Sequence, residues 1–146
     1  MSSARKVLDA FFDCLRNLDR STDRVAKLFA DEGVFEFPYL PTLGLQSRYT
    51  GPSEIRSLME MVASLVPSFT LSKIDIYDTT DPNTLFVEYH SEGTMKQSGT
   101  IYAQDYISKL AVEDGKIKSL REYLDVISSA RAILPNGLAD VPAPKK

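Results

Sequence analysis

One acidic residue stands between two leucines in the segment KIKSLREYLDV, residues 116–126. Side chains alternate between the two faces of a strand, so Leu120, Glu122 and Leu124 share one face. If that face lines an apolar cavity, the carboxylate is poorly solvated, which raises its pKa. A carboxyl group whose pKa lies near the working pH can both accept and donate a proton. Glu122 is therefore predicted either to transfer protons or to pair with a Lys or Arg of a neighbouring strand.

Two further titratable side chains are candidates for the same proton-transfer chemistry. His90, the only histidine, shares a strand face with Glu88, and histidine titrates close to neutral pH. Asp105 lies within AQDYISKL, where it either acts as a second buried acid or pairs with Lys109 on the same face. Both His90 and Asp105 also have a structural interpretation, as hydrogen-bonded or surface residues. Asp125 falls opposite Glu122 by alternation, and we expect it to cap the strand end or to form a salt bridge.

Apolar and aromatic side chains supply the candidate binding pocket. Six aromatic residues can line a pocket for a planar ligand, although aromatic residues also fill ordinary cores; they are Phe35, Phe37, Tyr39, Tyr89, Tyr102 and Tyr106. The residues predicted to contact the ligand are Phe37, Tyr39, Leu58, Val62, Tyr106, Leu120 and Leu124. The predicted ligand is a small hydrophobic or aromatic molecule.

Composition and missing motifs argue against several other classes of function. One histidine and one cysteine do not make a zinc site, and the sequence has no Gly-rich phosphate loop and no G-x-S-x-G elbow. We therefore expect no metal and no cofactor. A net charge of −3 without a basic cluster argues against nucleic acid, and the chain has no apolar run long enough to span a membrane. The first residues lack the uninterrupted apolar stretch of a signal peptide, so a cytoplasmic location is expected.

Turn and capping signals divide the chain into helices followed by strands. Helices are predicted over residues 3–19, over a short segment ending before Gly33, and over residues 52–66. Strands are predicted at 34–39, 69–78, 84–93, 99–112 and 116–127, and short connections make the last four an antiparallel meander. This order predicts an α+β fold in which three N-terminal helices pack on the concave face of a curved antiparallel sheet. We expect a single domain over residues 1–134 and a loose tail over residues 135–146.

Four segments, in this order and at this spacing, carry a family resemblance: LFADEGVFEFP at 28–38, YTGPSEIRSLM at 49–59, VEYHSEG at 87–93 and EDGKIKSLREYLDV at 113–126. With the order of elements, they resemble the SnoaL-like proteins of the nuclear transport factor 2 superfamily, which includes ketosteroid isomerase. Residues 77–89 and 113–134 most resemble the phenazine-biosynthesis A/B proteins. The resemblance implies a cone-shaped, cystatin-like fold and a homodimer that pairs through the outer face of the sheet.

The resemblance also implies site residues. SnoaL-like cyclases and the phenazine A/B proteins carry an acid/base residue on the last strand, and aligning the segment DGKI places it at Glu122. Asp105 lies near the position of a hydrogen-bond-donating Asp of ketosteroid isomerase. Phe37 occupies the position of the ketosteroid isomerase base, and Leu58 occupies the position of a histidine in the phenazine A/B proteins. Glu122 is thus the acid/base group that the resemblance carries over.

Two functions remain open from the sequence. The first is a cofactor-independent isomerase, cyclase or condensing enzyme that transfers protons on a small hydrophobic or aromatic metabolite. The second is a non-catalytic ligand-binding or dimerisation module on the same fold. A buried Glu122 in an open cavity, near a second polar group, favours the enzyme. A cavity filled by Phe37, Leu58 and Val62 favours the module.

Overall fold

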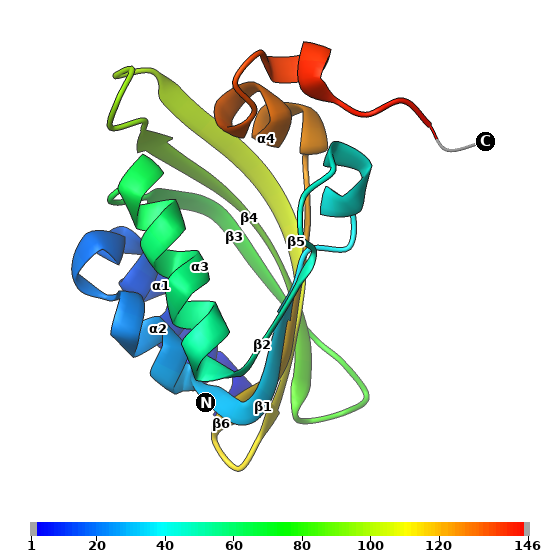
Figure 1. The fold of residues 1–146 in the computed structure, drawn as a ribbon. Coiled ribbons are helices and arrows are strands. Elements are labelled where there is room, and N and C mark those ends of the chain that lie inside the picture. Colours follow the sequence, from blue (N-terminus) through cyan, green and yellow to red (C-terminus); the bar gives the residue numbers. More distant parts are fainter. Residues whose placement is uncertain (1–2, 145–146) are drawn as a thin grey trace.

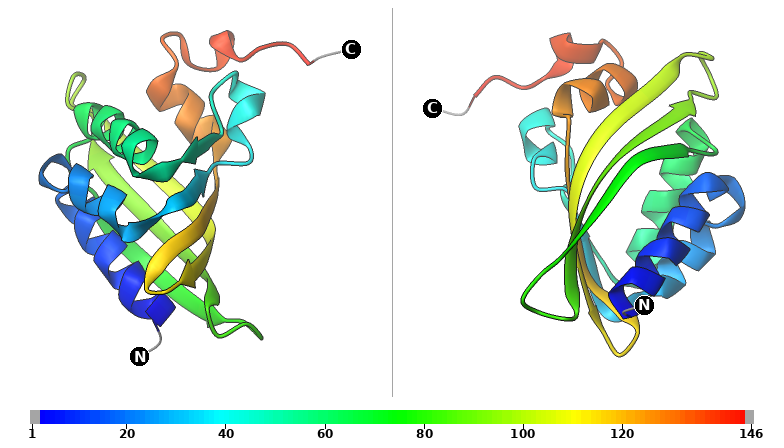
Figure 2. Two further views of the ribbon diagram at one scale, coloured as in Figure 1. Left: turned by 60° about the horizontal axis from the view of Figure 1, so that its bottom comes forward. Right: turned by 180° about the vertical axis from the view of Figure 1, so that it is seen from behind.

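Helices cover one face of a curved six-stranded sheet in the computed structural model, which describes residues 3–144 (Figure 1). Helices α1, α2 and α3 lie on the concave face, and α4 lies beyond the end of the last strand (Figure 2). The predicted α+β architecture is confirmed, although the described residues form four α-helices where three were predicted. The helices are α1 (Ser3–Arg16), α2 (Thr22–Leu28), α3 (Gly51–Leu65) and α4 (Val126–Ile133), with 3₁₀ turns at η1 (Leu18–Arg20), η2 (Leu40–Leu43) and η3 (Gly137–Asp140).

The sheet contains the predicted four-stranded antiparallel meander and two additional strands. Its spatial order is β2-β1-β6-β5-β4-β3, and β3 to β6 pair with their sequence neighbours as antiparallel strands. The sheet is not antiparallel throughout, because β1 pairs with β6 in parallel. The strands are β1 (Phe29–Glu36), β2 (Arg48–Thr50), β3 (Thr70–Asp78), β4 (Thr84–Thr94), β5 (Ile101–Glu113) and β6 (Lys116–Leu124).

The helices are held on the sheet by a continuous apolar core. The side chains of Val7, Leu8, Phe11 and Phe12 recur at helical spacing in α1 and are buried. The ring of Phe12 lies 4.8 Å from the ring of Tyr89 in β4, measured between centroids, which fixes α1 against the concave face. Burial of each such side chain stabilises the fold by about 1.5–3 kcal/mol.

Strand β1 begins earlier than predicted. The second helix ends at Leu28, and β1 starts at Phe29, whereas the sequence pattern placed the strand at 34–39. Gly33 was predicted to stop the helix but lies within β1, where an added Cβ would stand 2.5 Å from the carbonyl oxygen of Ile117 in β6. Glycine is therefore required because the two strands approach closely at this point.

Helix α4 replaces the end of the predicted last strand. The strand was expected to continue to residue 127, but it ends at Leu124 because Asp125 caps a helix. Its carboxylate accepts hydrogen bonds from the backbone N–H groups of Ile127 at 3.0 Å and Ser128 at 3.3 Å. The expected capping role of Asp125 is thus found at the start of a helix. Side-chain capping of this kind is typically worth about 1 kcal/mol.

Residues after α4 continue the chain as a 3₁₀ turn over Gly137–Asp140, which lies beside α4 (Figure 1). The predicted domain boundary at residue 134 stays a prediction. Across the described residues, every helix is too short or too polar to cross a membrane.

Candidate active site

An apolar cavity opens between the concave face of the sheet and the helices. Its volume is about 220 Å³, many times the roughly 10–15 Å³ that one water molecule needs. Phe37, Leu58 and Val62 line this space and leave it open, which is the arrangement that favours an enzyme over a collapsed module. Across the described residues, Glu122 is the only lining residue with an acidic or basic side chain.

Glu122 projects from β6 into this cavity. As alternation predicted, it shares the inner face with Leu120 and Leu124, and only 5% of its surface is exposed. Burial raises the pKa of Glu122 from 4.5 to about 7, while a hydrogen bond from the Tyr89 hydroxyl to Oε1, 2.8 Å long, acts in the opposite direction. The carboxyl group is therefore able to change its protonation state near neutral pH. Burial is the only cause that raises this pKa, as expected for a poorly solvated carboxylate.

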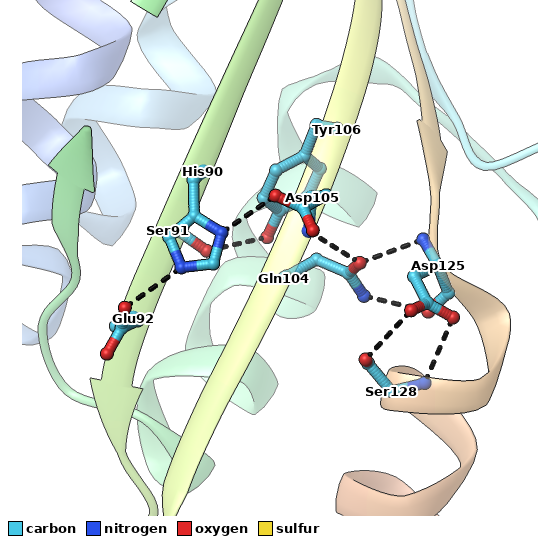
Figure 3. A network of polar contacts seen from close by, with 8 residues as sticks. All are labelled: His90, Ser91, Glu92, Gln104, Asp105, Tyr106, Asp125 and Ser128. Carbon is cyan, nitrogen blue, oxygen red and sulfur yellow. Dashed lines mark hydrogen bonds and ion pairs between the residues drawn. The ribbon is translucent and has the colours of Figure 1, made fainter. Parts of the chain in front are cut away.

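A second hydroxyl group stands in the same cavity. Tyr106 on β5 stacks on Tyr89, with ring centroids 4.4 Å apart, and its hydroxyl oxygen accepts a hydrogen bond from Ser91 at 3.2 Å (Figure 3). Within residues 3–144 the Tyr106 hydroxyl has no acceptor for its own hydrogen, and Oε2 of Glu122 has no donor. These two groups are polar contacts that the cavity offers to a ligand, beside the other polar lining residues Gln46, Tyr49, Ser91, Tyr102 and Ser129.

Gln104 joins the sheet to α4 at the rim of the cavity. Its amide nitrogen donates to the Tyr102 hydroxyl at 2.8 Å and to Ser129 Oγ at 3.1 Å. Its amide oxygen accepts from the backbone N–H of Asp125 at 2.8 Å (Figure 3). The side chain is almost fully buried. Sequence reasoning missed Gln104, although a polar residue at an inward position of β5, between Tyr102 and Tyr106, was a usable signal.

His90 and Asp105 lie on the opposite, outer face of the sheet (Figure 3). Nδ1 of His90 is 2.7 Å from Oδ1 of Asp105, and Nε2 is 2.9 Å from Oε2 of Glu92. These hydrogen bonds, first that with Asp105 and then that with Glu92, raise the pKa of His90. Asp105 is neither a buried acid nor a partner of Lys109, because its side chain is 77% exposed and bonded to His90. Neither residue reaches the cavity, because the strand alternation that turns Tyr89 and Tyr106 inward turns them outward.

Most of the predicted ligand-contacting residues line the cavity. Phe37, Leu58, Val62, Tyr106 and Leu124 do so, as do the aromatic residues Phe35, Tyr89 and Tyr102. Tyr39 does not, because it is 53% exposed and its ring contacts Tyr123 outside the cavity. Leu120 does not, because it is fully buried beside Phe35, its partner on β1, in the core below the cavity.

Metal binding has no support from side-chain geometry in the described part of the chain. There, no three or more His, Cys, Asp or Glu side chains are grouped so that they could hold an ion.

Comparison with known proteins identifies the family that this sequence matches. Residues 8–120 match the SnoaL-like domain family. An uncharacterised PhzA/B-like protein of Pseudomonas aeruginosa is 36% identical over 107 residues, which cover 73% of this chain and 74% of that protein.

Solved structures share the fold over nearly the whole chain. A candidate isomerase from Bacillus subtilis superposes with a TM-score of 0.80 at 26% identity, covering 89% of this chain and 91% of that one. A phenazine biosynthesis-related protein of Pseudomonas aeruginosa superposes with a TM-score of 0.76 at 21% identity, covering 99% of this chain and 89% of that one. At that identity the second likeness concerns the fold alone.

Proposed function

Because the chain belongs to the SnoaL-like family and has the nuclear transport factor 2-like fold, we propose that it is a cofactor-independent enzyme that moves a proton on a small hydrophobic or aromatic metabolite. Isomerisation, cyclisation and condensation are the reaction types that such a transfer serves. One observation carries the proposal, namely that Glu122 is the single acidic or basic side chain among the described residues of an apolar cavity and has a pKa of about 7.

Glu122 is the proposed proton carrier. In its ionised form, Oε2 removes a proton from a carbon next to a carbonyl group of the bound metabolite. The electron pair of the broken C–H bond forms a C=C bond to the carbonyl carbon while the carbonyl π pair moves onto the oxygen, which gives an enolate. When the deprotonated carbon also carries a C=C double bond, the enolate is conjugated with that bond. Protonated Glu122 then returns the proton to the far carbon of the double bond, so that the isomerisation moves the double bond and needs no further reactant.

Tyr106 is the proposed donor to the enolate oxygen. Its hydroxyl group lines the same cavity as Glu122 and keeps its own hydrogen available for a ligand. A donor already in place for developing negative charge in an apolar site is a strong source of transition-state stabilisation. Tyr89 holds Oε1 of Glu122, so that Oε2 is the oxygen that faces the reaction.

The test measures proton transfer directly and does not require the natural substrate. The bicyclic ketone 2-tetralone is incubated with the protein in D₂O, and loss of its α-hydrogens is followed by NMR. We expect the wild type to accelerate exchange and Glu122→Gln to lower the accelerated rate by about 10²–10⁴-fold. The wild-type rate should rise as pH increases through about 7, because the ionised carboxylate is the base.

Glu32→Gln is the matched control, since Glu32 is an exposed glutamate on β1 that lines neither the cavity nor the outer sheet surface of β3 to β6, and it should leave the rate unchanged. Exchange at equal rates in the wild type and in Glu122→Gln contradicts the proposal. Binding of 2-tetralone without any accelerated exchange favours the alternative function, a non-catalytic ligand-binding module.

We also propose that two copies pair through the outer face of the sheet. Tyr77 on β3 and Ile107 on β5 are 49% and 40% exposed on this face. Phe86 on β4 is the register partner of Tyr77, and Tyr123 on β6 is the register partner of Ile107. Exposed apolar side chains gathered on one surface are typical of an interaction site.

A further inference from the structure

A groove continues the cavity outward at the end of the sheet that α4 covers. It lies between the C-terminal end of α3, the hairpin that joins β4 to β5, and α4 (Figure 1), and its volume is about 930 Å³. Leu65, Met95, Tyr102, Ala132 and Ile133 line both the cavity and this groove. The two spaces therefore share a wall, and a ligand longer than the cavity would extend into the groove.

The groove carries one charge, and its sign is opposite to that of Glu122. Among the described residues that line it, Arg131 alone has a charged side chain. Arg131 is exposed in the last turn of α4 and forms no ion pair within residues 3–144. Ser128 precedes it by one helical turn and lines the same groove, so one face of α4 presents a hydroxyl group and a guanidinium group together.

We propose that the ligand is an elongated molecule with an apolar ring system in the cavity and a carboxylate in the groove, where Arg131 binds it. This inference rests on the proposed use of the cavity for a ligand and adds the chemical class of that ligand. The planar guanidinium group of arginine matches a carboxylate with two parallel hydrogen bonds.

Charge distribution fixes the direction of binding. A carboxylate placed inside the cavity would lie near Glu122, in apolar surroundings where two like charges repel strongly. A ligand carboxylate placed in the groove lies instead beside the solvent-exposed guanidinium group of Arg131. The reactive carbon then lies at the Glu122 end of the ligand, and Arg131 determines which molecules bind in that orientation.

The test compares matched ligands on matched variants. The probes are ω-(2-naphthyl)alkanoic acids with about two to six carbons in the chain, together with their primary amides, and binding is measured by isothermal titration calorimetry. For the acid whose length spans the two spaces, we expect about tenfold tighter binding than for its amide, which corresponds to about 1.4 kcal/mol. Arg131→Gln should abolish this preference by weakening the acid alone, and added salt should reduce it in the wild type.

Arg24→Gln is the control for the loss of one positive charge, because Arg24 is exposed on α2 and lines neither space. It should keep the preference for the acid. A wild type that binds acid and amide equally, or an acid preference that survives in Arg131→Gln, overturns the inference.

The outcome for the groove can be separated from the outcome for the catalytic proposal. If the amides bind and 2-tetralone exchange depends on Glu122, but no acid preference is seen, only the carboxylate-binding role of Arg131 fails. If the acid preference depends on Arg131 but Glu122→Gln does not affect exchange, the groove assignment holds and the proposed proton transfer fails.

Discussion

Replacement of Glu122 by Gln should change how the stability of the protein depends on pH. In the wild type the pKa of Glu122 is about 7 in the folded state and 4.5 in the unfolded chain, so the folded state binds the proton more tightly. The wild type is therefore at its most stable, with respect to this group, below pH 4.5, and loses that stability as pH rises through about 7.

The magnitude follows from the two pKa values. One pKa unit is worth about 1.4 kcal/mol, so a rise from 4.5 to about 7 lowers the free energy of unfolding by about 3 kcal/mol once the pH is well above 7. Most of this loss, about 2 to 3 kcal/mol, should occur between about pH 5 and pH 8. The amide that Glu122→Gln introduces does not titrate, and its oxygen can still accept the hydrogen bond from Tyr89. The difference in stability between variant and wild type should thus grow in favour of the variant as pH rises.

Urea denaturation at several pH values from about 5 to about 8, followed by circular dichroism at one fixed protein concentration, measures this difference. Glu32→Gln is the control, because the same chemical change at an exposed position of β1 should leave a difference from wild type that does not grow with pH. Parallel stability profiles for Glu122→Gln and wild type would refute the argument from burial. A variant that is clearly less stable at the alkaline end would identify Glu122 as a structural partner.

Two further predictions concern Tyr89 and the outer face of the sheet. Tyr89→Phe removes the hydrogen bond that lowers the pKa of Glu122, so a carboxyl ¹³C titration should find that pKa raised further. The lost hydrogen bond should cost about 0.5–1.5 kcal/mol of stability, and a lowered pKa would contradict the prediction. Pairing through the outer face predicts a mass of twice 16.3 kDa by light scattering, and Ile107→Glu should shift it toward one chain. A single-chain mass for the wild type at micromolar concentration would rule out the homodimer.

Local patterns were sufficient where the physical rule is itself local. The alternation of side chains along a strand placed Leu120, Glu122 and Leu124 on one face, and the structure has them there. Turn signals between short strands predicted the antiparallel meander of β3 to β6, because short connections allow neighbouring strands to pair only in this way.

The tertiary structure decided what alternation leaves open, namely which of the two faces meets the helices. His90 and Asp105 were placed on strand faces correctly, but only the packing of α1 and α3 turned those faces outward. The parallel pairing of β1 with β6 was also beyond local reasoning, because it joins segments far apart in the chain, as the pair of Glu36 with Arg121 shows.

The structure at the α4 end of the cavity also depends on contacts between distant segments. Asp125 ends β6 and starts α4, and the contacts of Gln104 hold that helix where it borders both the cavity and the groove. In the sequence, nothing connects the roles of Glu122 and Arg131. The sequence determined that a carboxylate would share a strand face with leucines. Only the folding of α4 over the end of the sheet placed a cation outside the space that Glu122 lines, because that placement depends on contacts between segments that no local pattern encodes.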